Sequence, residues 1–133
     1  IFFTVGSLDY LKMGGRIGKV ATAATGKLGV KPVIIMKDGD IGLGGIGRNR
    51  NKLKNSVLQV AKKYLDENNK DNFIVSVGYG YDKEEGFEFM KEVESTLDVK
   101  LDSETNVAIG IVSAVHTGPY PIGLGVIRKY ETL

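Results

Sequence analysis

The only histidine of the chain stands beside a threonine, in the run His116-Thr117-Gly118-Pro119. A neutral imidazole offers one N–H and a threonine one O–H, so the two side chains can donate together to a carboxylate. Gly118 permits a sharp turn and Pro119 stiffens it, which predicts a loop that follows a strand and presents both donors. The alternative is a loop histidine bonded to backbone. A Ser–His–Asp triad that uses Ser113 is disfavoured, because the sequence has no G-x-S-x-G elbow.

A second candidate is the glycine run Gly42–Gly47, which spells G-x-G-x-x-G. Backbone N–H groups in such a loop can approach a pyrophosphate at the N-terminus of a helix. However, the helical period begins only near Asn51, and the preceding residues have the pattern of a hairpin. A flexible return strand is therefore the favoured interpretation, and a nucleotide- or phosphate-binding domain is the alternative function.

Three arginines could recognise an anion or a partner. Arg48 and Arg50 alternate just before a predicted helix, and on charge alone a solvated basic helix start is the favoured interpretation. Cations are unfavourable at the N-terminus of a helix, however, and this hints at an interaction surface. The turn Gly14-Gly15 presents Arg16, whose guanidinium can bind a carboxylate or phosphate in two-point fashion. The alternative for Arg16 is an exposed side chain in a turn between helices.

Composition excludes several classes of function. The 133 residues contain no cysteine and one histidine, so disulfides, thiolate nucleophiles, cysteine zinc sites and multi-histidine metal sites are excluded, and we expect no metal. A net charge of +2 gives no support for nucleic-acid binding. No run approaches the ~20 apolar residues of a membrane span. Because the chain starts at Ile1, we expect a cut inside a longer protein.

The elements that must position these residues follow from hydrophobic periodicity. We predict strands at 1–5, 31–36, 40–43, 73–77, 107–112 and 125–128, a hairpin turn at 38–39, and helices after residue 7, at 17–28, at 51–67 and after residue 82. This order predicts one α+β domain over residues 1–133. Its sheet has about six strands, mostly antiparallel or mixed, with helices largely on one face and a helical cluster inserted after the first strand.

Five landmarks then appear in an order that resembles the DegV family. Residues 8–17 match L-x-Y-L-x-x-G-G-R-I, 31–34 and 38–39 match its K-P strand and D-G turn, 48–50 match R-x-R, and 116–125 match its H-T-G-P loop and following G-L-G. The sequence departs from the family pattern at Tyr120 and Pro121, where Gly and Ala are usual, and in the glycine-rich run at 42–47.

The resemblance implies the C-terminal domain of a bacterial, cytoplasmic, two-domain fatty-acid-binding protein that is not an enzyme and uses no cofactor. Its partners would be a long-chain fatty acid, the missing N-terminal domain, which adds Ser and Thr groups to the carboxylate site, and a separate fatty acid kinase subunit. By similarity, His116 and Thr117 would lie near the carboxylate, and Arg16, Arg48 and Arg50 would face the kinase. Gly14, Gly15, Gly118 and Pro119 would shape the two loops.

Overall fold

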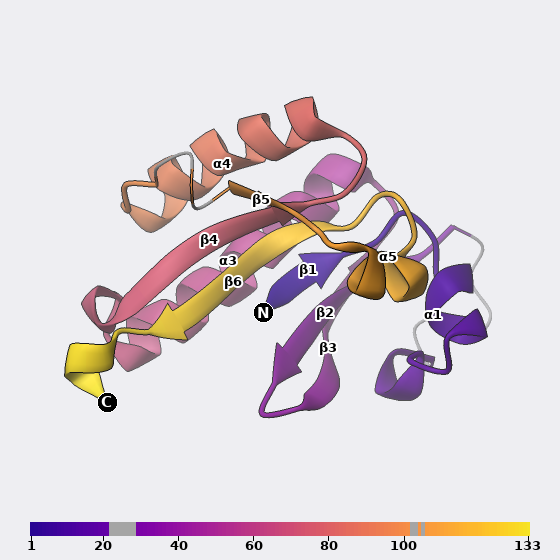
Figure 1. Ribbon diagram of the computed structural model, residues 1–133, viewed down its shortest axis with the longest axis horizontal. Coiled ribbons are helices and arrows are strands. Elements are labelled where there is room, and N and C mark those ends of the chain that lie inside the picture. The colour runs from indigo at the N-terminus through magenta and orange to yellow at the C-terminus, as the bar shows by residue number, and fades with distance from the viewer. Residues whose placement is uncertain (22–28, 102–103, 105) are drawn as a thin grey trace.

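The computed structural model describes residues 1–21, 29–101, 104 and 106–133, and its described part has the α+β architecture expected from the sequence (Figure 1). Six strands form one sheet in the order β3-β2-β1-β6-β4-β5. The pairings are antiparallel, except that β5 runs parallel to β4. The strands are β1 Phe2–Thr4, β2 Lys31–Lys37, β3 Asp40–Gly47, β4 Phe73–Tyr79, β5 Asn106–Ala108 and β6 Ile122–Arg128.

The described helices differ in length and in the face of the sheet that they cover. The two long ones, α3 and α4, pack on the same face, α3 against β1, β2, β3 and β6 and α4 against β4 and β5 (Figure 1). The helices are α1 Asp9–Met13, α3 Arg50–Asn68, α4 Lys83–Leu97 and α5 Ile111–Thr117, with short 3-10 turns η1 Gly18–Val20, η2 Lys70–Asn72 and η4 Tyr130–Thr132.

Strand β4 shows how the sheet divides into two faces. Val75 and Val77 are buried in the main core beneath α3 and α4, together with Phe89 of α4. Ile74, which points to the other face, is 52% exposed. This alternation is the period-2 pattern of a strand with one covered and one open face.

A smaller core lies on the opposite face, near α1 and η1. Phe3 of β1 and Ile34 of β2 are paired across the strands and pack with Leu11 and Val20. This cluster covers only the β1–β2 end of that face. The remaining part, over β4 and β6, is not covered by any described helix as long as α3 or α4 (Figure 1).

Local signals predicted the hairpin and the starts of α3 and α4. Asp38 and Gly39 both have positive φ, at 53° and 79°, and join β2 to β3. Asn49 caps α3 by accepting from the Lys52 N–H, and Asp82 caps α4 by accepting from the Glu85 N–H. The helical face predicted at 17–28 is described only up to residue 21, and its remainder lies outside the described residues.

The prediction for residues 109–117 was wrong, whereas the strand at 107–108 and the loop at 118–119 are present as predicted. Strand β5 ends at Ala108, and Ile111–Thr117 form helix α5 instead of the end of a strand and a loop. Gly110 is the N-cap of the helix, and its carbonyl accepts from the Ala114 N–H, while Gly118, the C-cap, has φ +76°. Its β-branched residues favour a strand locally, but packing against α1 stabilises the helix.

Candidate functional site

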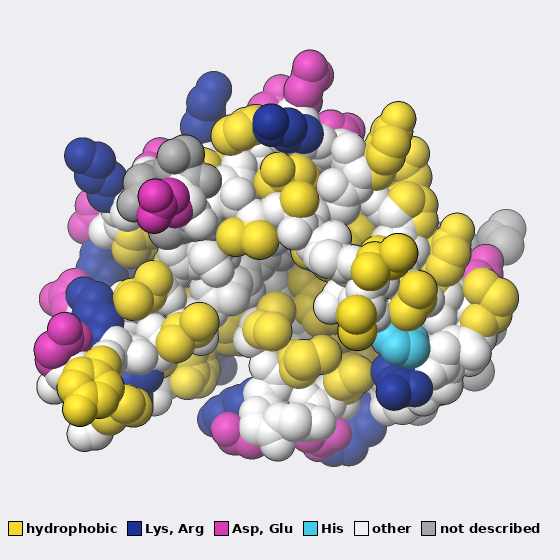
Figure 2. Space-filling model, in the orientation of Figure 1, with side chains coloured by type: hydrophobic (Ala, Val, Ile, Leu, Met, Phe, Trp, Pro, Cys, Tyr) yellow, Lys and Arg dark blue, Asp and Glu magenta, His cyan; other side chains and the backbone are white. Residues whose placement is uncertain are grey.

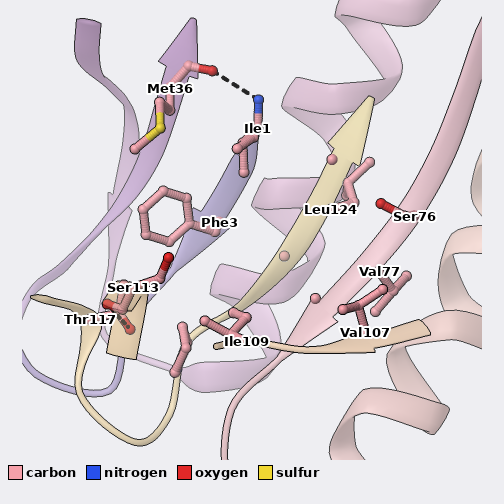
Figure 3. Close-up of a pocket in the computed structure, with 14 residues that line it drawn as sticks. Ile1, Phe3, Met36, Ser76, Val77, Val107, Ile109, Ser113, Thr117 and Leu124 are labelled. Atoms are coloured by element: carbon pink, nitrogen blue, oxygen red, sulfur yellow. Dashed lines mark hydrogen bonds between the residues drawn. The ribbon is translucent and has the colours of Figure 1, made fainter. Parts of the chain in front are cut away.

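An apolar pocket of about 290 Å³ opens on the face of the sheet opposite α3 and α4 (Figure 3). Its floor consists of β4 and β6, where Gly78 is paired with Gly123 and Ser76 with Gly125. Because three of these four positions lack a side chain, a ligand in the pocket lies on bare sheet backbone.

Large apolar side chains stand on either side of this floor. Figure 3 places Phe3 of β1, Met36 of β2 and Ile1, which precedes β1, on one side of the pocket. Val107 and Ile109 lie on the other side. The Ile1 nitrogen donates to the Met36 carbonyl at 2.8 Å, which extends the β1–β2 pairing to the pocket edge. The walls therefore suit a hydrocarbon.

Helix α5 contributes hydroxyl groups at one end of the pocket. Ser113 and Thr117 are one helical turn apart, and both line it (Figure 3). The Thr117 Oγ1 donates to the Ser113 carbonyl at 3.2 Å. Among the described lining residues, the only other polar side chain is Ser76, on the floor. The pocket thus combines apolar walls with a polar end, as a fatty acid requires.

Ser113 was not singled out as a head-group residue from the sequence. The signal was its spacing of four residues from Thr117, which places both on one side of a helix. That signal was hidden because this segment was predicted to be a strand followed by a loop.

His116 lies beside this end of the pocket but is not one of its lining residues. Its half-buried ring packs toward α1, and its Nδ1 is buried with no hydrogen-bond partner. An added Cβ on Gly14 would stand 2.1 Å from that nitrogen, and one on Gly118 would stand 2.4 Å from the Tyr10 ring. Both glycines therefore allow α1 and α5 to approach closely.

The outer surface of α5 is apolar. Ile111 and Val112 are each 79% exposed, and Val115 is 58% exposed. Figure 2 shows hydrophobic side chains gathered on this side of the molecule, next to the single histidine in cyan. A patch of this kind is typical of an interaction surface.

The three arginines lie in different surroundings. Arg16 is exposed and donates to the Gly14 carbonyl at 2.8 Å. Arg48 is exposed just before α3. Arg50 instead binds Glu85 of α4 through two hydrogen bonds of 2.8 Å each, from Nε and Nη2. The structure therefore leaves Arg48 and Arg16 facing solvent and engages Arg50 inside the fold.

The carboxylate of Glu85 is shared by two cations. Lys54 is buried, with 5% of its surface exposed, and its Nζ lies 3.7 Å from Glu85 Oε1. Arg50 binds the same carboxylate. The hydrogen bonds from Arg50 lower the pKa of Glu85 below its ordinary value, against the opposing effect of partial burial. This network ties the start of α3 to the start of α4.

The glycine run Gly42–Gly47 does not open a helix. It forms most of β3, the edge strand of a hairpin, and α3 begins only at Arg50. A dinucleotide fingerprint needs a strand, a glycine turn and a helix in immediate succession. The alternative of a nucleotide site at this run is therefore wrong.

The described part of the chain has neither a cluster of metal ligands nor a helix that could span a membrane. No group of three or more His, Cys, Asp or Glu side chains there could hold a metal ion. None of its helices combines the length and the hydrophobicity of a membrane span.

Sequence comparisons place the chain among known proteins. The model of uncharacterised DegV-family proteins matches residues 1–129. A DegV domain-containing protein of Clostridium acetobutylicum is 35% identical over 130 residues, which cover 97% of this chain and 45% of that protein. One from Deinococcus radiodurans is 29% identical, over 92% of this chain and 42% of its own length. The chain therefore spans less than half the length of these curated relatives.

Solved structures resemble the fold over nearly the whole chain. A DegV-family protein from Thermus thermophilus, described as binding fatty acid, aligns with a TM-score of 0.76 and 26% identity, over 96% of this chain and 45% of its own. A fatty-acid-binding DegV-family protein from Streptococcus agalactiae aligns with a TM-score of 0.78, over 96% of this chain and 44% of its own. The latter is 20% identical and supports the fold alone.

Proposed function

This chain belongs to the DegV family, and we propose that it binds a long-chain fatty acid with the acyl tail in the pocket on the open face of the sheet. The observation that carries this proposal is the pocket itself, with apolar walls, a backbone floor and two hydroxyls at one end. The relative from Thermus thermophilus, whose description reports fatty-acid binding, supports the same ligand class.

The energetics suit a carrier rather than an enzyme. Burial of an acyl tail gains ~0.8 kcal/mol per CH₂ group, so the walls around Phe3 and Met36 supply most of the affinity. A few polar groups then orient the head group. We propose that Ser113 and Thr117 do this from α5, with the Thr117 hydroxyl turning its hydrogen from the Ser113 carbonyl to the carboxylate, and that the adjacent His116 adds a contact through Nε2. No nucleophile or metal is needed for such a role.

The pocket covers only part of a long ligand. Its volume of about 290 Å³ lies at the lower limit of ligand pockets, which span roughly 300–1,000 Å³. We propose that an N-terminal domain, which the longer relatives have room for, closes the open side and completes the head-group site. The exposed apolar surface of α5 supports contact with such a domain.

Lipid extraction from the purified protein, followed by mass spectrometry and calorimetry with an added fatty acid, tests the proposal. Met36→Glu places a charge in the pocket wall and is expected to lower affinity at least roughly tenfold, because burial of an unpaired charge is costly. Met13→Glu is the matched control, since Met13 is 76% exposed and does not line this pocket. No bound lipid and no calorimetric signal would reject the proposal.

We also propose that a fatty acid kinase subunit docks near Arg48 and phosphorylates the presented carboxyl group in the cytoplasm. Arg48 is exposed, whereas Arg50 is engaged with Glu85 and Arg16 donates to the Gly14 carbonyl, so Arg48 is the best placed of the three. A pull-down with the kinase should lose signal for Arg48→Glu and keep it for Lys91→Glu, which reverses an exposed charge on α4. Equal capture of both variants would place the docking surface elsewhere.

A further inference from the structure

Two glycines on the pocket floor are not required by the fold. A Cβ on Gly78 would be 3.5 Å from the nearest atom, in Ile109, and one on Gly125 would be 3.4 Å from the Ser76 hydroxyl. Both are ordinary contact distances. Neither residue has a positive φ, so alanine could adopt both backbone conformations.

Their neighbour Gly123 differs in this respect. A Cβ there would stand 2.1 Å from the Phe2 carbonyl oxygen and 2.4 Å from the Phe3 Cβ. The pairing of β1 with β6 therefore requires glycine at position 123. Of the three glycines on the floor, one serves the fold and two do not.

Glycine inside a strand weakens it relative to alanine, because the unfolded chain loses more freedom and no side chain packs. Gly78 and Gly125 impose this cost at two positions that line the pocket. A methyl group at either position would project into the pocket, because the neighbouring Val77 and Leu124 face the main core. The absence of side chains at these two positions therefore enlarges the pocket.

We propose that Gly78 and Gly125 determine which acyl chains the protein accepts, by leaving clearance for a bent, cis-unsaturated tail between the floor and the wall around Phe3. This inference rests on the proposed fatty-acid function. A cis double bond makes a chain sweep a wider path than a straight saturated chain of the same carbon number. A floor at backbone level therefore favours the bent chain, and a methyl group on it would select against that chain.

The experiment compares Gly78→Ala and Gly125→Ala with the wild type by calorimetry, using a saturated and a cis-mono-unsaturated acid of eighteen carbons. Gly42→Ala on β3 is the control, because it also replaces a strand glycine but lies outside the pocket, with its nearest contact at 3.8 Å. We expect each pocket variant to lose roughly tenfold in affinity for the bent chain, in line with one methyl group in an apolar pocket. The loss for the straight chain is expected to be smaller, and the control should bind both acids as the wild type does.

Equal losses for both acids, or none, would overturn the inference while the fatty-acid function stands. A fall in the unfolding temperature of either pocket variant would also overturn it, because the glycine would then serve the fold. Failure of the wild type to bind either acid is a different result, which would end the proposed function and this inference with it.

Discussion

The imidazole of His116 rests on the bare backbone of Gly14, where a Cβ would stand 2.1 Å from Nδ1. Gly14 has φ −81°, so its backbone conformation is open to any residue. Glycine is required there by the ring of His116, not by the turn. This contact holds α5 against α1 and fixes the direction in which Thr117, the next residue, faces the pocket.

Gly14→Ala should therefore destabilise the protein, by about 1–3 kcal/mol, the usual cost of overpacking. Urea denaturation of the variant measures this loss. In a protein that already carries His116→Ala, the methyl group added by Gly14→Ala no longer meets a ring. The loss of stability that Gly14→Ala causes in that background should therefore be markedly smaller than in the wild type. Additive effects of the two substitutions would contradict the contact.

The hydroxyls at the α5 end of the pocket should matter for the head group and the floor hydroxyl should not. Thr117→Val and Ser113→Ala are each expected to lower fatty-acid affinity, by roughly tenfold or more, because a hydrogen bond to a carboxylate contributes about 1.5–3 kcal/mol. Ser76→Ala removes a hydroxyl from the same pocket and serves as the control in calorimetry. A larger effect of Ser76→Ala would place the head group near Ser76 rather than at the α5 end.

His116 is tested separately because it lies beside the pocket rather than in its lining. Its Nδ1 is buried against Gly14, so a head group would be reached through Nε2. We expect His116→Ala to weaken fatty-acid binding in calorimetry. Unchanged affinity, together with lower stability, would restrict His116 to the packing of α5 on α1.

The ion pair of Arg50 with Glu85 predicts a specific loss of stability in acid. Arg50 lowers the pKa of Glu85 in the folded state, so the contribution is complete above the unfolded value of about 4.3 and is lost as the pH falls through the folded value. Glu85→Gln should cost about 1–3 kcal/mol at neutral pH, since Arg50 and Lys54 lose a charged partner. It should also flatten the decline of stability below about pH 4.3.

Chemical denaturation at neutral pH and at about pH 3 measures both effects. Asp66→Asn is the control, because the Lys62–Asp66 pair is exposed on both sides and should contribute less than about 1 kcal/mol. An unchanged acid slope in Glu85→Gln would show that other carboxylates govern the acid response.

The apolar surface of α5 should make this chain self-associate when it is studied alone. Ile111 and Val112 are each 79% exposed, and such patches associate in water. Light scattering should report assemblies for the wild type and monomers after Ile111→Lys and Val112→Lys are combined. Tyr130→Lys, at an 86% exposed site on η4, is the control and should leave the assemblies intact. A monodisperse wild-type monomer would contradict this prediction.

Much of the fold could be predicted because its signals are local. Positive φ at Asp38 and Gly39 follows from the residue types themselves, and the caps at Asn49 and Asp82 lie directly before periodic helices. Helix α5 could not be predicted in this way. Its β-branched residues favour a strand, and the contacts that stabilise the helix come from α1, about a hundred residues earlier in the chain.

The site was less predictable than the fold because more of its geometry depends on contacts between residues far apart in the chain. Thr117 was predicted from its chemistry to be a head-group residue, and that role stays a prediction, although the side chain lines the pocket. The floor depends on the register between β4 and β6, which brings Gly78 opposite Gly123, and no local pattern encodes that pairing. Arg50 was expected to face a partner, but it binds Glu85, 35 residues later in the chain, and no local pattern indicates that pair.

The most direct test of fatty-acid binding in this pocket is a crystal structure with a fatty acid that carries a bromine at the end of its tail. Fatty-acid binding in this pocket predicts an anomalous peak above the floor formed by Gly78, Gly123 and Gly125, with the carboxylate toward Thr117. An ordered tail in the separate hollow beside Tyr64 of α3, or no ordered ligand at saturating concentration, would contradict it.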